Sequence, residues 1–272
     1  MALRSYSLAV VAAVNDDKVL RDNLAMSPMI NEDRVPLIAE RGYQSAAKAY
    51  NTGLDKVTAD IVIFAHQDVY LPRGWDKTLL STVRAFDQNK NNWGVLGVIG
   101  ADENGDLVGT AWSTGLGYEI KSEFSSPKAI RSIDEIVIVV RRETGLRFDE
   151  DLPGYHLYGT DIVQTALHCD FGAYVFDGPV IHNSDPHKTQ GLWLDCSYVK
   201  AYRYIQRKWK GKLPIVTLIV PITKSGWPLL RKLASQAKRY YFRQATIRKR
   251  YTERIDPKRV AQDLGYEEKD GK

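Results

Sequence analysis

The chain has 272 residues, of which 44% are hydrophobic and 26% are charged, a composition typical of one large globular domain or a domain plus an appendage. Its two cysteines, Cys169 and Cys196, form no close-spaced pair, which argues against a disulfide framework or a zinc site and fits a reducing cytoplasm. The first apolar run, residues 8–14, is too short to span a membrane and has no cleavage-site pattern, so we expect a protein that is not exported.

Charge is distributed unevenly along the chain. The net charge is +5, yet residues 198–251 contain 15 Lys and Arg and no Asp or Glu, while the rest contains 23 Lys and Arg against 33 Asp and Glu. An acidic front and a strongly basic back indicate two functional parts. We therefore predict a main domain over residues 1–197 and a basic helical appendage over residues 198–272.

In the front part, apolar segments of strand type alternate with segments of helical periodicity. We predict strands at 8–14, 35–39, 61–65, 93–100, 136–140, 173–176 and 180–182, and helices at 20–26, 44–56, 75–86 and 161–168. The dipeptide Asn104-Gly105 is a strong signal for a two-residue hairpin turn. Strands that alternate with helices predict an α/β fold with a mostly parallel sheet flanked by helices.

Polar residues stand at the ends of several predicted strands. His66, Gln67 and Asp68 follow the continuous apolar run 61–65, which is typical of a strand buried on both faces. Asn15 and Asp16 end the first strand, Glu40 the second, and His182 a late one. Ligands of open α/β sheets bind beyond the carboxyl ends of the strands, so these residues predict a site there. The alternative is a set of ordinary polar turns.

The stretch from Ala49 to Gly53, followed by residues 59–68, resembles the signature of GT-A glycosyltransferases. In that signature a helical Ala-x-Asn-x-Gly precedes, nine residues after its Asn, an Asp, a hydrophobic strand and an Asp-x-Asp motif. Asn51 and Asp60 have that spacing; Asp68 occupies the second metal-motif position and His66 the first, which is a departure. With Leu71-Pro72-x-Gly74-Trp75 after it, the chain is similar over residues 7–187 to a divergent bacterial branch of the inverting family 2-like glycosyltransferases.

The resemblance implies a GT-A, Rossmann-like fold and a divalent metal, Mn²⁺ or Mg²⁺, which stabilises the charge on a departing nucleoside diphosphate. Asp68 and His182 are the expected metal ligands, with His66 as a third and His187 as the alternative to His182. Imidazole suits Mn²⁺ better than Mg²⁺. A loop histidine bonded to backbone is the competing interpretation of His182.

The resemblance also implies a base and a nucleotide site. Asp161, at the start of a helix, matches the late carboxylate that removes the acceptor's proton; the competing interpretation is a helix N-terminal carboxylate. For the nucleotide we predict contacts from five residues at or near the strand ends and the preceding helix, namely Asn15, Asp16, Glu40, Asn51 and Gln67. Several of these could instead be helix caps or surface charges.

The basic part predicts helices at 198–210 and 227–251, separated by a ten-residue apolar segment, 213–222, too short to cross a bilayer. The second helix is amphipathic, with Trp and Tyr at its edges, which favours adsorption to an anionic membrane surface. The alternatives are a solvated face on a docked helix and, third, nucleic-acid binding, which we consider unlikely because no nucleic-acid fold accompanies the helix. We expect the tail after Arg254 to be mobile.

Two functional hypotheses follow. The first is a metal-dependent, inverting glycosyltransferase that moves a sugar from a nucleotide-sugar donor to a saccharide or lipid-linked acceptor, in the cytoplasm or on the inner face of the membrane. The second is a non-catalytic module that binds a nucleotide or sugar and is recruited by its basic helix, because His66 replaces the usual aspartate.

Overall fold

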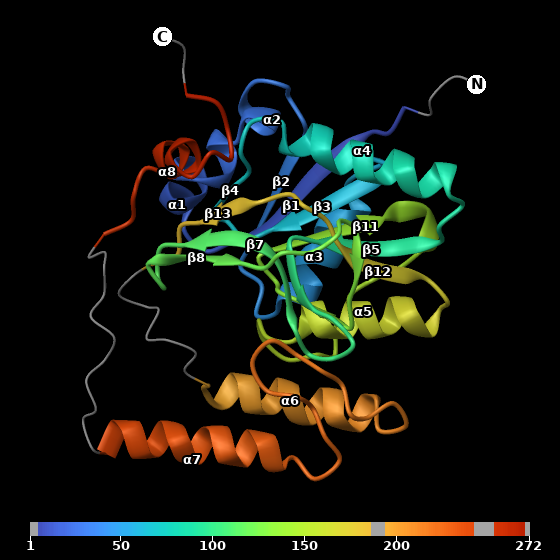
Figure 1. The fold of residues 1–272 in the computed structure, drawn as a ribbon, viewed down its shortest axis with the longest axis vertical. Helices are drawn as coiled ribbons and strands as arrows, with labels where there is room; N and C mark the ends of the chain where they lie inside the picture. Colours follow the sequence, from blue (N-terminus) through green and yellow to red (C-terminus); the bar gives the residue numbers. More distant parts are fainter. Residues whose placement is uncertain (1–4, 186–193, 242–252, 270–272) are drawn as a thin grey trace.

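The computed structural model describes residues 5–185, 194–241 and 253–269 (Figure 1). A seven-stranded sheet lies at its centre, in the order β2-β1-β3-β11-β5-β12-β9. Its strands are β1 Leu8–Val14, β2 Leu37–Arg41, β3 Ile61–Ala65, β5 Trp93–Gly97, β9 Lys128–Ala129, β11 Val137–Arg141 and β12 Gly172–Val175. β11 and β9 run antiparallel to their neighbours, whereas the other pairs are parallel. The predicted α/β fold with a mostly parallel sheet is confirmed.

Helices cover both faces of this sheet (Figure 1). Because side chains alternate along a strand, Val10 and Ala12 of β1 enter one buried cluster while Ala9 and Val11 enter the other. The first cluster is covered by α1 Asp17–Asp22, the 3-10 turn η1 Leu24–Met26, α2 Pro28–Asn31 and α4 Trp75–Gln88. The second is covered by α3 Ala46–Asp55 and α5 Tyr158–His168.

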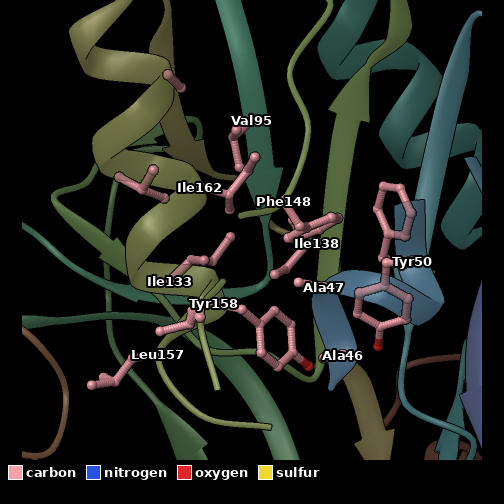
Figure 2. Packing of buried hydrophobic residues seen from close by; sticks show 14 of the residues in the cluster. Ala46, Ala47, Tyr50, Val95, Ile133, Ile138, Phe148, Leu157, Tyr158 and Ile162 are labelled. Atoms are coloured by element: carbon pink, nitrogen blue, oxygen red, sulfur yellow. The ribbon is translucent and has the colours of Figure 1, made fainter. Parts of the chain in front are cut away.

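An aromatic group fastens α3 and α5 to the sheet beneath the candidate site. The ring of Tyr50 on α3 lies 5.0 Å from Phe64 of β3 and 5.6 Å from Tyr158 of α5, centroid to centroid. Phe148, in the loop before α5, packs edge-on against Phe64 at 4.9 Å. Figure 2 shows Tyr50, Phe148 and Tyr158 together in this layer. The packing fixes the start of α5 relative to the end of β3.

A second, smaller sheet follows the order β10-β6-β7-β13-β4, with β8 paired to β7. Its strands are β4 Val69–Tyr70, β6 Ile99–Ala101, β7 Leu107–Ser113, β8 Tyr118–Lys121, β10 Ser132–Ile133 and β13 Val180–His182. Asn104-Gly105 does lie in the connection between the antiparallel strands β6 and β7, but this connection is the loop 102–106 and not the predicted two-residue turn. The predicted strand 93–100 was wrong as one unit, because the chain passes from β5 in the large sheet to β6 in the small one.

Two other predictions need correction near the N-terminus. The helix predicted at 20–26 is not continuous, because its residues are shared between the end of α1 and η1, and α2 follows as a separate turn. The strand predicted at 35–39 starts later, at Leu37, and continues to Arg41, so Glu40 lies inside β2 rather than after it. The physical reason is pairing, since Ala13 and Val14 at the end of β1 extend the ladder to Glu40 and Arg41.

The basic part packs on the α5 side of the sheet (Figure 1). α6 Cys196–Lys208 buries Ala201, Tyr202 and Ile205 in the second cluster, and α7 Trp227–Tyr241 adds Leu229. The apolar segment between them is irregular, with one bridge from Ile215 to Ile222. Of the helix predicted at 227–251, the part beyond Tyr241 lies outside the described residues. In the described part of the chain, no helix has the length and hydropathy required to cross a membrane.

The segment after Arg254 was expected to be mobile, and the structure shows otherwise. It forms α8 Pro257–Asp263, capped by Asp256, whose side chain accepts from the backbone N–H groups of Lys258 and Arg259. Ala261 packs with Tyr70, Trp112 and Ile181 in a third apolar cluster against the small sheet. The chain therefore returns from the basic helices to the main domain.

Candidate metal and nucleotide site

The candidate metal site forms where β3 ends. His66 and Asp68 follow β3, and His182 ends β13, which pairs with β4 directly after Asp68. One ligand atom from each of His66, Asp68 and His182 lies within 4.8 Å of the others. The structure therefore brings together the three residues predicted as metal ligands; His187 lies outside the described residues.

Asp68 and His182 stabilise each other's charged forms. Nε2 of His182 lies 3.5 Å from Oδ1 of Asp68. Burial opposes both charges, but their mutual attraction outweighs it, so the pKa of Asp68 is held well below its usual range and the pKa of His182 lies above its usual value. Burial lowers the pKa of His66, which favours the neutral imidazole that binds metals.

The three side chains fit a divalent metal. Ligand-to-metal distances of about 2.1 Å place two ligands at most about 4.2 Å apart, so a small contraction of the cluster closes the site. Two imidazoles and one carboxylate suit Mn²⁺ better than Mg²⁺, which prefers oxygen ligands. The hydroxyl of Tyr158 lies 2.9 Å from Nε2 of His66, an outer contact of the kind that orients a ligand histidine.

Three residues predicted for the nucleotide lie together beside this cluster. Oε1 of Gln67 accepts from the backbone N–H groups of Asn15 and Asp16 at 3.0 and 3.1 Å, and Nε2 of Gln67 donates to Oδ1 of Asn15 at 2.6 Å. β1 and β3 are neighbours in the sheet, which is why their ends meet. Asp16 also caps α1 through Lys18 N–H and Val19 N–H.

The other two predicted nucleotide residues are occupied elsewhere. Asn51 is 2% exposed; its Nδ2 donates to the carbonyl of Phe148 and to Glu150, and its Oδ1 accepts from Phe148 N–H. Glu40 is 4% exposed and pairs with Lys56 at 2.6 Å. The structure gives both side chains a structural role, because their polar atoms are bound within the protein.

Asp161, predicted as the base, faces α6. Its Oδ2 lies 2.8 Å from Nζ of Lys208, and its Oδ1 accepts from Nε1 of Trp209 at 2.7 Å. Asp161 is 2% exposed, and burial raises its pKa although Lys208 and Trp209 oppose the rise. Both oxygens are thus engaged, in a network that includes Asp149 on the same lysine.

Residues that the sequence analysis missed also approach the cluster. β11 is antiparallel to β3, so its start, with Asp134 and Glu135, lies beside the end of β3. From the C-terminal segment, Nε of Arg254 donates to the carbonyl of Asn183 at 3.1 Å, next to His182. The Asp256-Pro257 pair is a sequence signal for the helix that follows Arg254, whereas no sequence pattern reports the direction of β11.

A family model described as "Glycosyltransferase like family" matches residues 9–176 of the chain. A curated relative from Fuscovulum blasticum, named "ATP synthase subunits region ORF 6", is 28% identical over 135 residues, which cover 44% of this chain and 50% of the relative. The chain thus spans about half the length of that relative.

Solved structures with a similar arrangement share little sequence with the chain. The mannosyltransferase PcManGT from Pyrobaculum calidifontis, in complex with GDP-Man and Mn²⁺, is 12% identical with a TM-score of 0.48, covering 97% of this chain and 80% of that one. GalNAc-T7 with UDP, GalNAc and Mn²⁺ is 14% identical with a TM-score of 0.43, covering 77% and 52%. A197 from STIV is 11% identical with a TM-score of 0.40, covering 63% and 82%.

Proposed function

The chain belongs to the glycosyltransferase-like family, and on that premise we propose that it is an active enzyme that transfers a sugar from a nucleotide-sugar donor to a hydroxyl acceptor. The transfer depends on a divalent metal, which we propose to be Mn²⁺. The acceptor is a saccharide or a lipid-linked glycan, and the reaction inverts the anomeric carbon.

One observation carries this proposal. His66, Asp68 and His182 converge at the end of β3. Directly beside them, at the end of β1, Gln67 is hydrogen-bonded to the backbone of Asn15 and Asp16. Binding of a nucleotide-diphosphate donor requires two things at adjoining strand ends. One is a group of metal ligands, and the other is a group of polar residues that can contact the nucleotide.

The chemistry follows from where charge develops. A metal bound by His66, Asp68 and His182 supplies positive charge for the diphosphate that leaves. Tyr158 holds the ring of His66, and Gln67 fixes the Asn15-Asp16 backbone against which the nucleotide lies. The acceptor oxygen forms the new bond to the sugar carbon as the bond to the donor phosphate breaks, and its proton passes to a protein carboxylate. A single displacement of this kind inverts configuration.

Thermal unfolding tests the metal and nucleotide site. We expect Mn²⁺ with one of UDP, GDP, CDP or TDP to raise the melting temperature, since ligands that bind only the folded state stabilise it by RT ln(1 + [L]/Kd). Asp68→Ala removes the shift, whereas Asp55→Ala, at an exposed ion pair with Arg147, keeps it. Cooperative unfolding with no shift for any nucleotide counts against a transferase.

The second hypothesis, a non-catalytic binding module, keeps the nucleotide shift but lacks turnover. An activity assay distinguishes the enzyme from the binding module. It measures the release of nucleoside diphosphate from the nucleotide-sugar whose nucleotide raises the melting temperature. Turnover that Asp68→Ala abolishes supports the enzyme, and binding without turnover supports the module.

α7 suits contact with an anionic membrane surface. Leu229 and Leu233 face the core, while Trp227 and Leu230 are 61% and 51% exposed, on the same helix as the exposed cations Arg231 and Lys238. Apolar side chains among cations are the composition of helices that adsorb to anionic lipid. We propose that this face holds the protein at a membrane that carries a lipid-linked acceptor.

A further inference from the structure

Glu135 is brought to the candidate site by the direction of β11. The backbone N–H of His66 donates to the carbonyl of Ile136 at 3.0 Å, which makes Glu135 the next residue beyond the paired strands. The ladder between β3 and β11 starts at Ala65 and Val137, so Glu135 lies at the level of the residues that follow β3. Its side chain is half-buried, and it therefore remains open to solvent in part.

The start of α5 holds the Glu135 carboxylate. The backbone N–H groups of Leu157 and Gly159 lower the pKa of the Glu135 carboxyl, against the larger effect of burial, which places the carboxyl near the start of α5. A Cβ at position 159 would lie 3.3 Å from Cγ of Glu135 and 2.8 Å from the carbonyl oxygen of Ile133, so a glycine leaves room for the carboxylate. Leu157 is buried with φ of 64°, a left-handed conformation that is costly for a leucine and is fixed by the surrounding packing.

Tyr158 links Glu135 to the metal cluster. Its hydroxyl lies 2.9 Å from Nε2 of His66 and donates to the backbone carbonyl of Glu135 at 3.3 Å. The backbone of Glu135 is thus joined to His66, a proposed metal ligand, through the single side chain of Tyr158. Asp161, one turn further along α5, has both oxygens engaged by Lys208 and Trp209 and is 2% exposed.

We propose that Glu135 is the catalytic proton acceptor, the group that receives the proton of the acceptor hydroxyl during transfer. This inference rests on the proposed function. The O–H bond of the acceptor breaks, its proton moves to a carboxylate oxygen of Glu135, and its electron pair forms the bond to the sugar carbon. The donor's carbon–oxygen bond breaks at the same time, and the nucleoside diphosphate leaves with that electron pair.

The surroundings of Glu135 suit this task. Burial, followed by the charge of Asp134, raises the pKa of Glu135 to about 8, although the backbone hydrogen bonds oppose the rise. Among the described residues, the charge of Glu135 also acts on three tyrosines on neighbouring helices, Tyr50 of α3, Tyr158 of α5 and Tyr198 of α6. A base is most effective when its pKa lies near the working pH, so we expect the transfer rate to increase with pH towards about 8.

The test compares variants in release of nucleoside diphosphate, using the donor that stabilises the wild type with Mn²⁺, and water and octyl glycosides as acceptors. Glu135→Gln keeps the shape of the side chain, so we expect kcat to fall by about 10²–10⁴-fold while KM for the donor and the nucleotide-dependent thermal shift persist. Glu135→Asp should restore part of the rate with a displaced pH profile. Glu103→Gln, at a carboxylate whose side chain is 73% exposed, is the matched control.

The outcomes are distinct. Glu135→Gln within tenfold of the wild-type kcat overturns the proposal, as does loss of turnover in Asp161→Asn while Glu135→Gln keeps it. If Glu135→Gln does not fold, a pH profile of Glu135→Asp that matches the wild type overturns it, and a displaced profile supports it. A wild-type protein that binds no nucleotide with Mn²⁺ fails at the proposed function, and one that binds without turnover overturns the catalytic role of Glu135.

Discussion

Lys208→Met should destabilise the fold, because it leaves the buried carboxylate of Asp161 without its cation. Nζ of Lys208 lies 2.8 Å from Asp161 and 2.6 Å from Asp149, and the side chain of Asp161 is only 2% exposed. Removing one partner of a buried pair costs about 3–5 kcal/mol. Trp209 still donates to Asp161, and Lys208 is itself 27% exposed. We therefore expect the free energy of unfolding to fall by about 2–3 kcal/mol in Lys208→Met.

The loss should depend on pH. Burial raises the pKa of Asp161 even with Lys208 present, and removing the lysine raises it further. A carboxyl group with a raised folded-state pKa contributes stability below its unfolded pKa and loses that contribution as pH rises through the folded value. The loss of stability in Lys208→Met should therefore be small at acid pH and grow as the pH rises through the raised pKa of Asp161.

Urea unfolding at several pH values measures this. The double variant with Asp161→Asn should recover part of the loss, with a coupling of about 2 kcal/mol between the two positions. Arg147→Met, which breaks the exposed pair with Asp55, is the matched control and should cost no more than about 1 kcal/mol. A Lys208→Met deficit below about 0.5 kcal/mol at pH 7, or one that is constant with pH, refutes the role given to this lysine.

Three further predictions concern the metal, a buried amide and α7. Mn²⁺ affinity should weaken by about tenfold per pH unit below the raised pKa of His182, because the metal must displace its proton; calorimetry in two buffers measures the released proton, and a pH-independent affinity contradicts the assignment. Asn51→Ala should lower the free energy of unfolding by about 2–4 kcal/mol in thermal or urea unfolding, since both backbone groups of Phe148 lose their partner. A cost no larger than that of Thr52→Ala, whose hydroxyl only donates to the carbonyl of Lys48 in the same helix, argues against it. Joint replacement of Trp227 and Leu230 by alanine should lower binding to anionic vesicles about tenfold or more, and equal co-sedimentation of this variant and Leu107→Ala removes the membrane proposal.

The strands could be predicted from the sequence, because a short continuous apolar run is typical of a buried strand. The directions of the strands could not be predicted. A strand buried on both faces has the same pattern whichever way it runs. The alternation of strands and helices predicts a mostly parallel sheet, and nothing in the pattern marks 136–140 as a strand that runs the other way. The structure reverses β11, and the residues at the site are those before it, Asp134 and Glu135.

The meeting of His66, Asp68 and His182 could be predicted because each stands at the end of a strand or just after it, where the polar residues of neighbouring strands come together. Asn51 and Asp161 lie on helices. The periodicity of a helical sequence does not predict which part of the fold a polar side chain at the edge of the buried face will contact. Asn51 faces the loop at Phe148, and Asp161 faces α6. Those partners lie 97 and 48 positions away in sequence, beyond the reach of local patterns.

The docking of the C-terminal segment has a consequence for how the molecule is made. Glu267 hydrogen-bonds to the hydroxyl of Tyr70 across 197 positions of sequence, and Nδ2 of Asn183, beside His182, donates to the carbonyl of Ile255. During translation the front domain leaves the ribosome first, yet these contacts can form only when α8 and Glu267 have emerged. The surroundings of His182 are therefore completed only after α8 has been made, and a chain that stops before α8 lacks these contacts.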